Sequence, residues 1–201
     1  MEYWNEIIAG LDDTSIEEYI AVFSGIIYVV LAAKKIRWCW WFAMLSTGLY
    51  IYLCYVESLY IESFLQMFYF GMAIYGWLYW SYGSKKELPI ARWSLRYHLI
   101  NIFISGIVSL LLGWIMARYT EQSSPYLDAF TSVFSLAATF MVAKRILENW
   151  IYWIVIDVAL FFLYTSKGYE LTGLHYGLFA IFAIVALNSW WHYYKRQTNN
   201  D

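Results

Sequence analysis

The sequence predicts an all-α polytopic membrane protein, and three observations carry that prediction. Hydrophobic residues make up 62% of the 201 residues and charged residues only 14%, whereas soluble domains average roughly 45–50% and 25%. Seven stretches approach the roughly 20 apolar residues that a helix needs to cross a bilayer. None of them shows the period-two alternation that marks a strand. A soluble fold of this length has too little interior to bury so much apolar surface.

Seven predicted spans follow one another along the chain. They cover residues 19–33, 38–56, 60–80, 97–117, 126–143, 150–164 and 171–191. With seven spans the loops alternate between two sides of the membrane, and eleven Lys and Arg residues collect on one side against two on the other. Because cytoplasmic loops carry the excess of basic residues, we expect the N-terminus outside the cell and the C-terminus in the cytoplasm.

An internal repeat links the two ends of the chain. The run AKKI at 33–36 recurs as AKRI at 143–146, and a Trp follows at the same distance in both copies. Further along, a one-residue slip aligns Gln66 with His175. The first three predicted spans therefore resemble the last three. Equivalent points are four spans apart, so both copies run in the same direction through the membrane.

The predicted organisation is two parallel three-helix repeats joined by a linker helix. In chain order we expect an acidic extracytoplasmic N-terminus (1–18), a first three-helix repeat (19–80), a basic cytoplasmic loop (81–96), the linker helix (97–117), a second three-helix repeat (126–191) and a cytoplasmic tail (192–201). Parallel repeats of this kind occur in transporters whose substrate binds near the membrane midplane between the two halves.

Polar and aromatic side chains form stripes along several spans. Spacings of three and four residues place side chains on one helix face, and a polar face in lipid is expected to turn toward protein or a cavity. The candidate substrate-binding residues are Gln66, Tyr69, Trp77 and Trp80 on the third span, Asn149, Trp153 and Asp157 on the sixth, Thr47 on the second and His175 on the seventh.

Asp157 is the sharpest of these candidates, because it is the one carboxylate deep within a predicted span. A charge at the bilayer centre costs at least about 2.5–3.5 kcal/mol, so such a residue is a functional-site hypothesis by default. The alternative is an Asp that bonds to a neighbouring helix. Similarly, His175 is either a ligand contact or a packed contact between helices, and Thr47 is either a ligand contact or bonded to its own helix.

Several runs of residues resemble the PnuC family of vitamin transporters over roughly residues 20–194. These runs are GIIY at 25–28, LY at 59–60, QMFY at 66–69, IYGWLYW at 74–80 and ENWIYW at 148–153. The resemblance implies a 3+1+3 fold of the SWEET type and facilitated uptake of nicotinamide riboside across the bacterial inner membrane. It also implies relatives that carry thiamine, riboflavin or deoxynucleosides.

One position departs from the pattern of that family. Members that carry nicotinamide riboside show NxxxWxxW on the third core helix, and here Trp77 and Trp80 match while Ala73 stands in place of Asn. Nicotinamide riboside stays the leading substrate and thiamine is the alternative. Both carry a cationic aromatic ring, which aromatic side chains and a carboxylate would attract. The resemblance further implies trapping of the vitamin by a cytoplasmic kinase, with no direct contact.

Other function classes find little support. The chain has no GxxxxGK[ST] run, HExxH or GxSxG motif, so neither an ATPase nor an intramembrane enzyme is indicated. Its three His are too scattered for a metal site, no cofactor is expected, and a net charge of −2 does not favour nucleic acid. A membrane scaffold that transports nothing is the remaining alternative. A homo-oligomer, for example a trimer, is compatible with such a fold.

Overall fold

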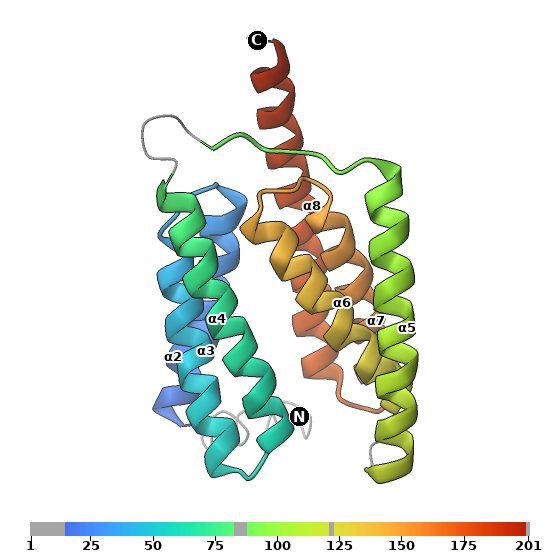
Figure 1. Ribbon diagram of the computed structural model, residues 1–201. Helices are drawn as coiled ribbons and strands as arrows, with labels where there is room; N and C mark the ends of the chain where they lie inside the picture. The colour runs from blue at the N-terminus through green and yellow to red at the C-terminus, as the bar shows by residue number, and fades with distance from the viewer. Residues whose placement is uncertain (1–14, 83–87, 121–122, 200–201) are drawn as a thin grey trace.

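The computed structural model describes residues 15–82, 88–120 and 123–199, and within these ranges the chain forms seven helices and no strand (Figure 1). The helices are α2 (Ile16–Ala33), α3 (Cys39–Val56), α4 (Tyr60–Tyr82), α5 (Leu95–Tyr119), α6 (Pro125–Ala143), α7 (Asn149–Ser166) and α8 (Glu170–Asn199). Each predicted span coincides with one helix. The prediction for the acidic N-terminus falls mostly on residues 1–14, which lie outside the described ranges.

Six of the seven helices are long and apolar enough to cross a membrane. The exception is α4, which has 23 residues and a length of about 34 Å at 1.5 Å per residue. Its mean hydropathy is low because five Tyr and two Trp lie along it. Tyr and Trp have low hydropathy values, yet both are enriched at membrane interfaces.

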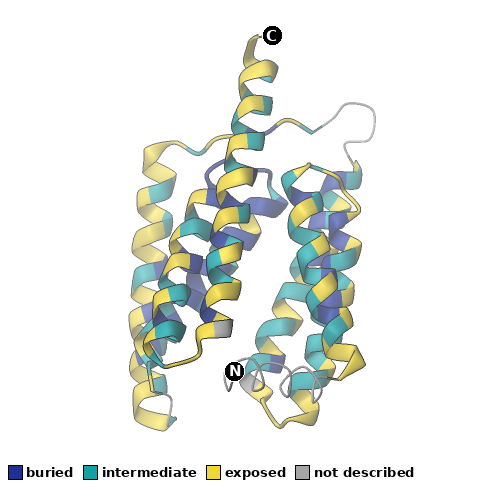
Figure 2. Cartoon of the chain, turned by 180° about the vertical axis from the view of Figure 1, so that it is seen from behind, coloured by how far each residue is buried: buried dark blue, intermediate teal, exposed yellow. Residues whose placement is uncertain are grey.

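The helices pack as two groups of three. In the first half, α2 packs on α3 and α3 on α4, and in the second half α6 packs on α7 and α7 on α8. The halves meet where α4 contacts α6 and where α2 contacts α8, while α5 packs on α6 at the outside of the bundle (Figure 1). Buried residues lie on the faces that the helices turn toward one another (Figure 2). The exposed outer faces are apolar, as expected where lipid is the solvent.

Equivalent elements of the two halves are 110 residues apart. The bounds of α3 and α7 differ by this offset at both ends, and so do the first residues of α4 and α8. The turns before them match as well, because Ser58 and Gly168 both adopt positive φ. The predicted one-residue slip is therefore wrong. Gln66 corresponds to Tyr176 and not to His175, since the connecting turns have equal length.

Turns of the same kind close the other end of each half. Lys35 has a φ of 61° and Arg145 a φ of 54°. Each lies in the turn directly after its helix, where backbone N–H groups donate to the last carbonyls of that helix. We call this end of the bundle the basic end. It carries the α2–α3 turn, the segment 88–94, the α6–α7 turn and the C-terminal part of α8, all at the top of Figure 1.

Four indole rings form the core at the basic end. Trp40, Trp80, Trp150 and Trp190 are each at most 4% exposed and belong to one buried cluster. Trp40 meets Trp80 edge to face with ring centroids 5.5 Å apart, and Trp150 meets Trp190 in the same way at 5.5 Å. These edge-to-face contacts are the favoured geometry for aromatic pairs. Both pairs occupy equivalent positions in the two halves.

Gly76 is required for this packing. A Cβ atom at Gly76 would collide with the Trp40 ring, whereas a Cβ at Gly71 on the same helix meets nothing within 4 Å. We therefore expect Gly76→Ala to lower the free energy of unfolding by about 1–3 kcal/mol through overpacking. Gly71→Ala is the matched control and is expected to leave stability unchanged or slightly higher, because Ala favours helix. Thermal melting of the purified variants in detergent measures both, and equal melting temperatures would contradict this packing.

Candidate substrate-binding site

A cavity of about 360 Å³ lies between the two halves. All six helices of the halves contribute to its wall, whereas α5 does not. The volume lies in the range of pockets that hold small molecules. Its polar lining consists of Ser46, Thr47, Gln66, Ser135, Thr139, Asp157 and His175, and its aromatic lining of Tyr28, Trp40, Tyr50, Tyr69, Trp150, Trp153, Tyr176 and Phe179.

Three of the small hydroxyl groups in the wall, those of Ser46, Thr47 and Thr139, donate to backbone carbonyls. Thr47 Oγ1 donates to Ala43 O at 2.7 Å, and Ser46 Oγ donates to Ala21 O at 2.8 Å. This back-bonding satisfies the hydroxyl proton inside its own helix pair. Their oxygens still accept, so these groups offer a ligand acceptors and not donors.

Asp157 is the single acidic group in the cavity wall. Its side chain projects from α7, and the residue is only 5% exposed. Among the residues that the structure describes, none forms a hydrogen bond or an ion pair with its carboxylate. A buried carboxylate without a partner is costly to keep ionised. A bound cation would supply the missing partner.

Aromatic residues from both halves line the cavity beside the polar groups. Tyr176 stacks on Tyr164 with ring centroids 5.4 Å apart and an angle of 12° between the rings. Phe179 lies 4.6 Å from the ring of His175. Such walls favour a flat ring system, and they attract it more strongly if it is cationic.

Six of the nine predicted site residues line this cavity: Thr47, Gln66, Tyr69, Trp153, Asp157 and His175. Trp77, Trp80 and Asn149 lie outside the lining. Trp80 donates from Nε1 to Ala143 O at 2.9 Å, and Asn149 donates from Nδ2 to Ile146 O at 2.6 Å.

Trp77 faces a different neighbourhood from the cavity. Its ring centroid lies 5.3 Å from that of Trp38 and 5.6 Å from that of Trp41, and the Arg37 guanidinium lies 5.5 Å from it. Helical spacing placed Trp77 on the same face as Gln66, but the cavity ends before the helix does. The last part of α4 enters the aromatic core at the basic end instead.

Sequence reasoning missed several residues of the wall. Tyr28, Ser135 and Thr139 lie on α2 and α6, for which no polar stripe was predicted. Tyr176 was missed because the slipped alignment paired Gln66 with its neighbour. A constant offset of 110 residues would have found it.

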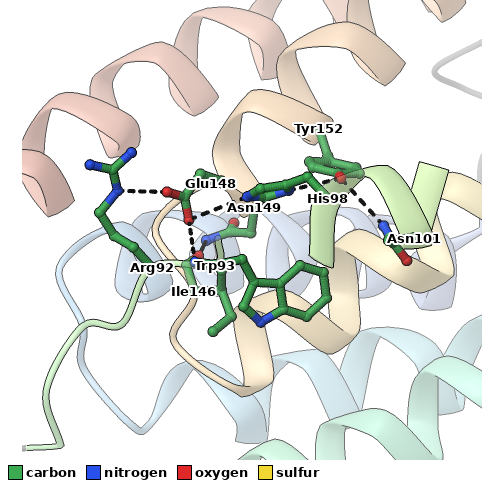
Figure 3. A network of polar contacts seen from close by, with 8 residues as sticks. All are labelled: Arg92, Trp93, His98, Asn101, Ile146, Glu148, Asn149 and Tyr152. Carbon is green, nitrogen blue, oxygen red and sulfur yellow. Dashed lines mark hydrogen bonds and ion pairs between the residues drawn. The ribbon is translucent and has the colours of Figure 1, made fainter. Parts of the chain in front are cut away.

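A second polar network lies outside the cavity, where the segment before α5 meets the start of α7 (Figure 3). Arg92 Nε donates to Glu148 Oε1 at 2.7 Å, and the Trp93 backbone N–H donates to Oε2 at 3.3 Å. The bond to Glu148 raises the pKa of the Arg92 guanidinium. His98 Nδ1 lies 3.1 Å from the Tyr152 hydroxyl. The network ties α5 to α7 and contributes nothing to the cavity wall.

Comparisons with known proteins identify the family of this chain. The profile of a family described as "Nicotinamide mononucleotide transporter" matches residues 15–192. The chain belongs to this family, which is the PnuC family. The match runs from the residue before α2 to residue 192 in α8.

The relatives in the PnuC family are named for more than one vitamin. The nicotinamide riboside transporter PnuC of Escherichia coli is 23% identical over 210 residues, which cover 90% of this chain and 87% of the relative. The riboflavin/roseoflavin transporter RibM of Streptomyces davaonensis is 25% identical over 174 residues, which cover 83% and 80%. Family membership therefore supports a vitamin transporter and leaves the substrate open.

A solved structure supports the fold. The crystal structure of the vitamin B3 transporter PnuC matches with a TM-score of 0.73 at 22% identity, and the match covers 95% of this chain and 87% of the other. At this identity the likeness concerns the arrangement of the helices alone.

Glu148 is expected to stabilise this PnuC-family fold through the network of Figure 3. Glu148→Ala removes the acceptor for Arg92 and for the Trp93 N–H, and Glu148 is only 7% exposed. We expect a loss of about 1–3 kcal/mol in the free energy of unfolding. Glu57→Ala, at an exposed site at the end of α3, is the control and is expected to be neutral. Thermal melting in detergent decides, and identical melting temperatures for the two variants would refute the role of Glu148.

Proposed function

We propose that this protein carries a cationic aromatic vitamin, nicotinamide riboside first, across the bacterial inner membrane by facilitated diffusion. The observation that carries the proposal is the carboxylate of Asp157, which no described residue pairs with, in an aromatic-walled cavity between two helical halves. A fixed positive charge on a flat ring is the complement of such a site. Each aromatic face adds roughly 0.5–2 kcal/mol of attraction for a cation.

The remaining polar groups suit the sugar of the vitamin. Gln66 and His175 both line the cavity and offer donors and acceptors to ribose hydroxyls. Trp153 lies one helical turn from Asp157 on α7, so a ring held against the indole face would place its charge near the carboxylate. Asn149, Trp77 and Trp80 lie outside the cavity wall and do not touch the substrate in this proposal.

The architecture that supports this function is a 3+1+3 arrangement of the SWEET type. The constant offset of 110 residues between the halves and the outer position of α5 both favour it. In this proposal α4 crosses the membrane with the other six helices, the N-terminus lies outside and the basic end faces the cytoplasm. The halves rock against each other around the cavity. A cytoplasmic kinase that phosphorylates the vitamin would trap it inside.

Thiamine is the second candidate, and Ala73 is the observation that favours it. Ala73 lines the cavity and is 1% exposed, so the wall offers space where an amide would hydrogen-bond the ligand. Thiamine also carries a cationic ring. Riboflavin, which a relative carries by its name, has no fixed positive charge and would gain nothing from Asp157.

Ligand binding tests the site directly. We expect nicotinamide riboside to quench the tryptophan fluorescence of the purified protein with saturation. Asp157→Asn is expected to raise the Kd by about tenfold or more, equivalent to about 1.4 kcal/mol, because the charge balance is lost. Trp77→Phe, outside the cavity, is the control and keeps the Kd within about twofold.

The alternative outcomes of this titration separate the rival functions. Tighter binding of thiamine than of nicotinamide riboside makes Ala73 the residue that sets specificity and refutes the leading substrate. Absence of binding by both cations, in protein that melts cooperatively, contradicts a vitamin transporter and favours a scaffold.

Facilitated diffusion predicts uptake that equilibrates. In proteoliposomes held at zero membrane potential, radiolabelled substrate is expected to enter until the inner and outer concentrations are equal, whether or not a proton or sodium gradient is imposed. The physical reason is that Asp157 is the one acidic group in the cavity wall, whereas proton relays use chains of ionisable groups. Liposomes without protein serve as the control for leakage. Accumulation above the outer concentration under a gradient would contradict this mechanism.

A further inference from the structure

Hydrogen bonds between the two halves gather at the basic end. Trp80 Nε1 donates to Ala143 O at 2.9 Å, and Trp190 Nε1 donates to Ala32 O at 3.1 Å. Ser189 Oγ donates to Ala33 O at 3.2 Å. In each of these bonds a side chain near the end of one half reaches the last helical turn of α2 or α6 in the other half. They hold the halves together on one side of the cavity.

Arg145 contacts three separate elements. From the α6–α7 turn its Nη1 donates to Leu88 O at 2.6 Å, and its Nη2 donates to Lys35 O at 3.2 Å. Its guanidinium also lies 4.2 Å from the ring of Trp80. One side chain of the second half therefore contacts the α2–α3 turn, α4 and the segment that leads into α5. Arg145 is 7% exposed.

Arg145 lies behind the cavity wall, on the side of the basic end. Trp40 and Trp150 form part of the cavity wall, and Trp80 packs behind Trp40 with ring centroids 5.5 Å apart. Arg145 packs on Trp80 and is not part of the wall. The order from the cavity toward the basic end is thus Trp40, Trp80 and Arg145.

The segment before α5 adds further hydrogen bonds at the basic end. Ala91 N–H donates to Arg145 O at 3.0 Å, and Leu147 N–H donates to Ala91 O at 2.9 Å. The Gln197 side chain on α8 pairs with both backbone groups of Ile90, at 3.0 and 3.1 Å. Residues 88–91 thus lie across the basic end, bound to the α6–α7 turn and to α8.

We propose that Arg145 is a positioning residue for transport, a latch that holds the basic end closed and must release before the cavity opens toward the cytoplasm. The proposal rests on the proposed function in one respect, since it takes opening of this end to be a step of transport. A guanidinium suits the task because its planar fork donates to two carbonyls at once. Lys35, at the equivalent position of the first half, instead places its Nζ 4.6 Å from the Tyr193 ring.

A native cysteine reports whether this end is open. Cys39 is 0% exposed and belongs to the same buried cluster as Trp40 and Trp80. Cys54 is partly exposed and lies near the other end of α3. The purified protein in detergent is treated with a water-soluble maleimide, and the modification of both thiols is followed by peptide mass spectrometry. Faster labelling of Cys39 alone indicates opening at the basic end, whereas faster labelling of both thiols indicates general loosening.

We expect Arg145→Ala to raise the labelling rate of Cys39 about tenfold or more, which corresponds to about 1.4 kcal/mol in the closing equilibrium. The labelling rate of Cys54 is expected to stay unchanged. Lys34→Ala is the matched control, because it removes a positive charge from the same end at an exposed position, and it is expected to label as the wild type does. The Kd for nicotinamide riboside stays within about twofold in Arg145→Ala, since Arg145 does not line the cavity.

Three outcomes decide the proposal. Equal Cys39 rates in the wild type, Arg145→Ala and Lys34→Ala would overturn the latch even if the vitamin binds. A raised Cys39 rate in protein that binds no vitamin supports the latch and refutes the proposed function. If Arg145→Ala does not fold, Arg145→Gln replaces it, because Gln retains a donor for one carbonyl; a Cys39 rate equal to that of the wild type in this variant would also overturn the latch.

Discussion

Four buried indole rings are the constraint on which the rest of this structure depends. Trp40, Trp80, Trp150 and Trp190 fill the interface between the halves at the basic end, and two of them bond to the opposite half. Lipid offers little hydrophobic drive for helices to associate, so close packing and hydrogen bonds must hold the halves together. Concentrating both at one end leaves the rest of the interface free to form a cavity.

The chemistry of the cavity comes from the residues that line the part of the interface away from the basic end. Its wall combines aromatic rings with one carboxylate, Asp157, that no described residue satisfies. In a membrane such a group is costly, and here it lies in the wall of the cavity between the two halves. In the proposed function, a cationic ring as ligand would compensate this cost and would contact the surrounding aromatic faces. Trp40 and Trp150 belong both to the buried cluster and to the cavity wall, so the packing at the basic end also bounds the cavity.

Much of the fold follows from the sequence, because long apolar stretches have few ways to satisfy their backbone in lipid. All seven helices were predictable, and so were six residues of the cavity wall, including Gln66 and Asp157. The depth at which the cavity ends was not predictable, because helical spacing gives a face and not a height. Trp77 and Trp80 were placed in the site for this reason. The slipped alignment arose from similar letters near Tyr60, whereas the equal turn lengths fix the true register.

The charge of the ligand is the central claim, and one measurement tests it most directly. Isothermal titration calorimetry compares nicotinamide riboside with its reduced dihydro form, which has a similar shape and no fixed charge, in the wild type and in Asp157→Asn. The account predicts that the wild type binds the cation about tenfold or more tightly than the neutral form, and that Asp157→Asn removes most of this preference. An equal preference in both proteins would contradict the role of Asp157.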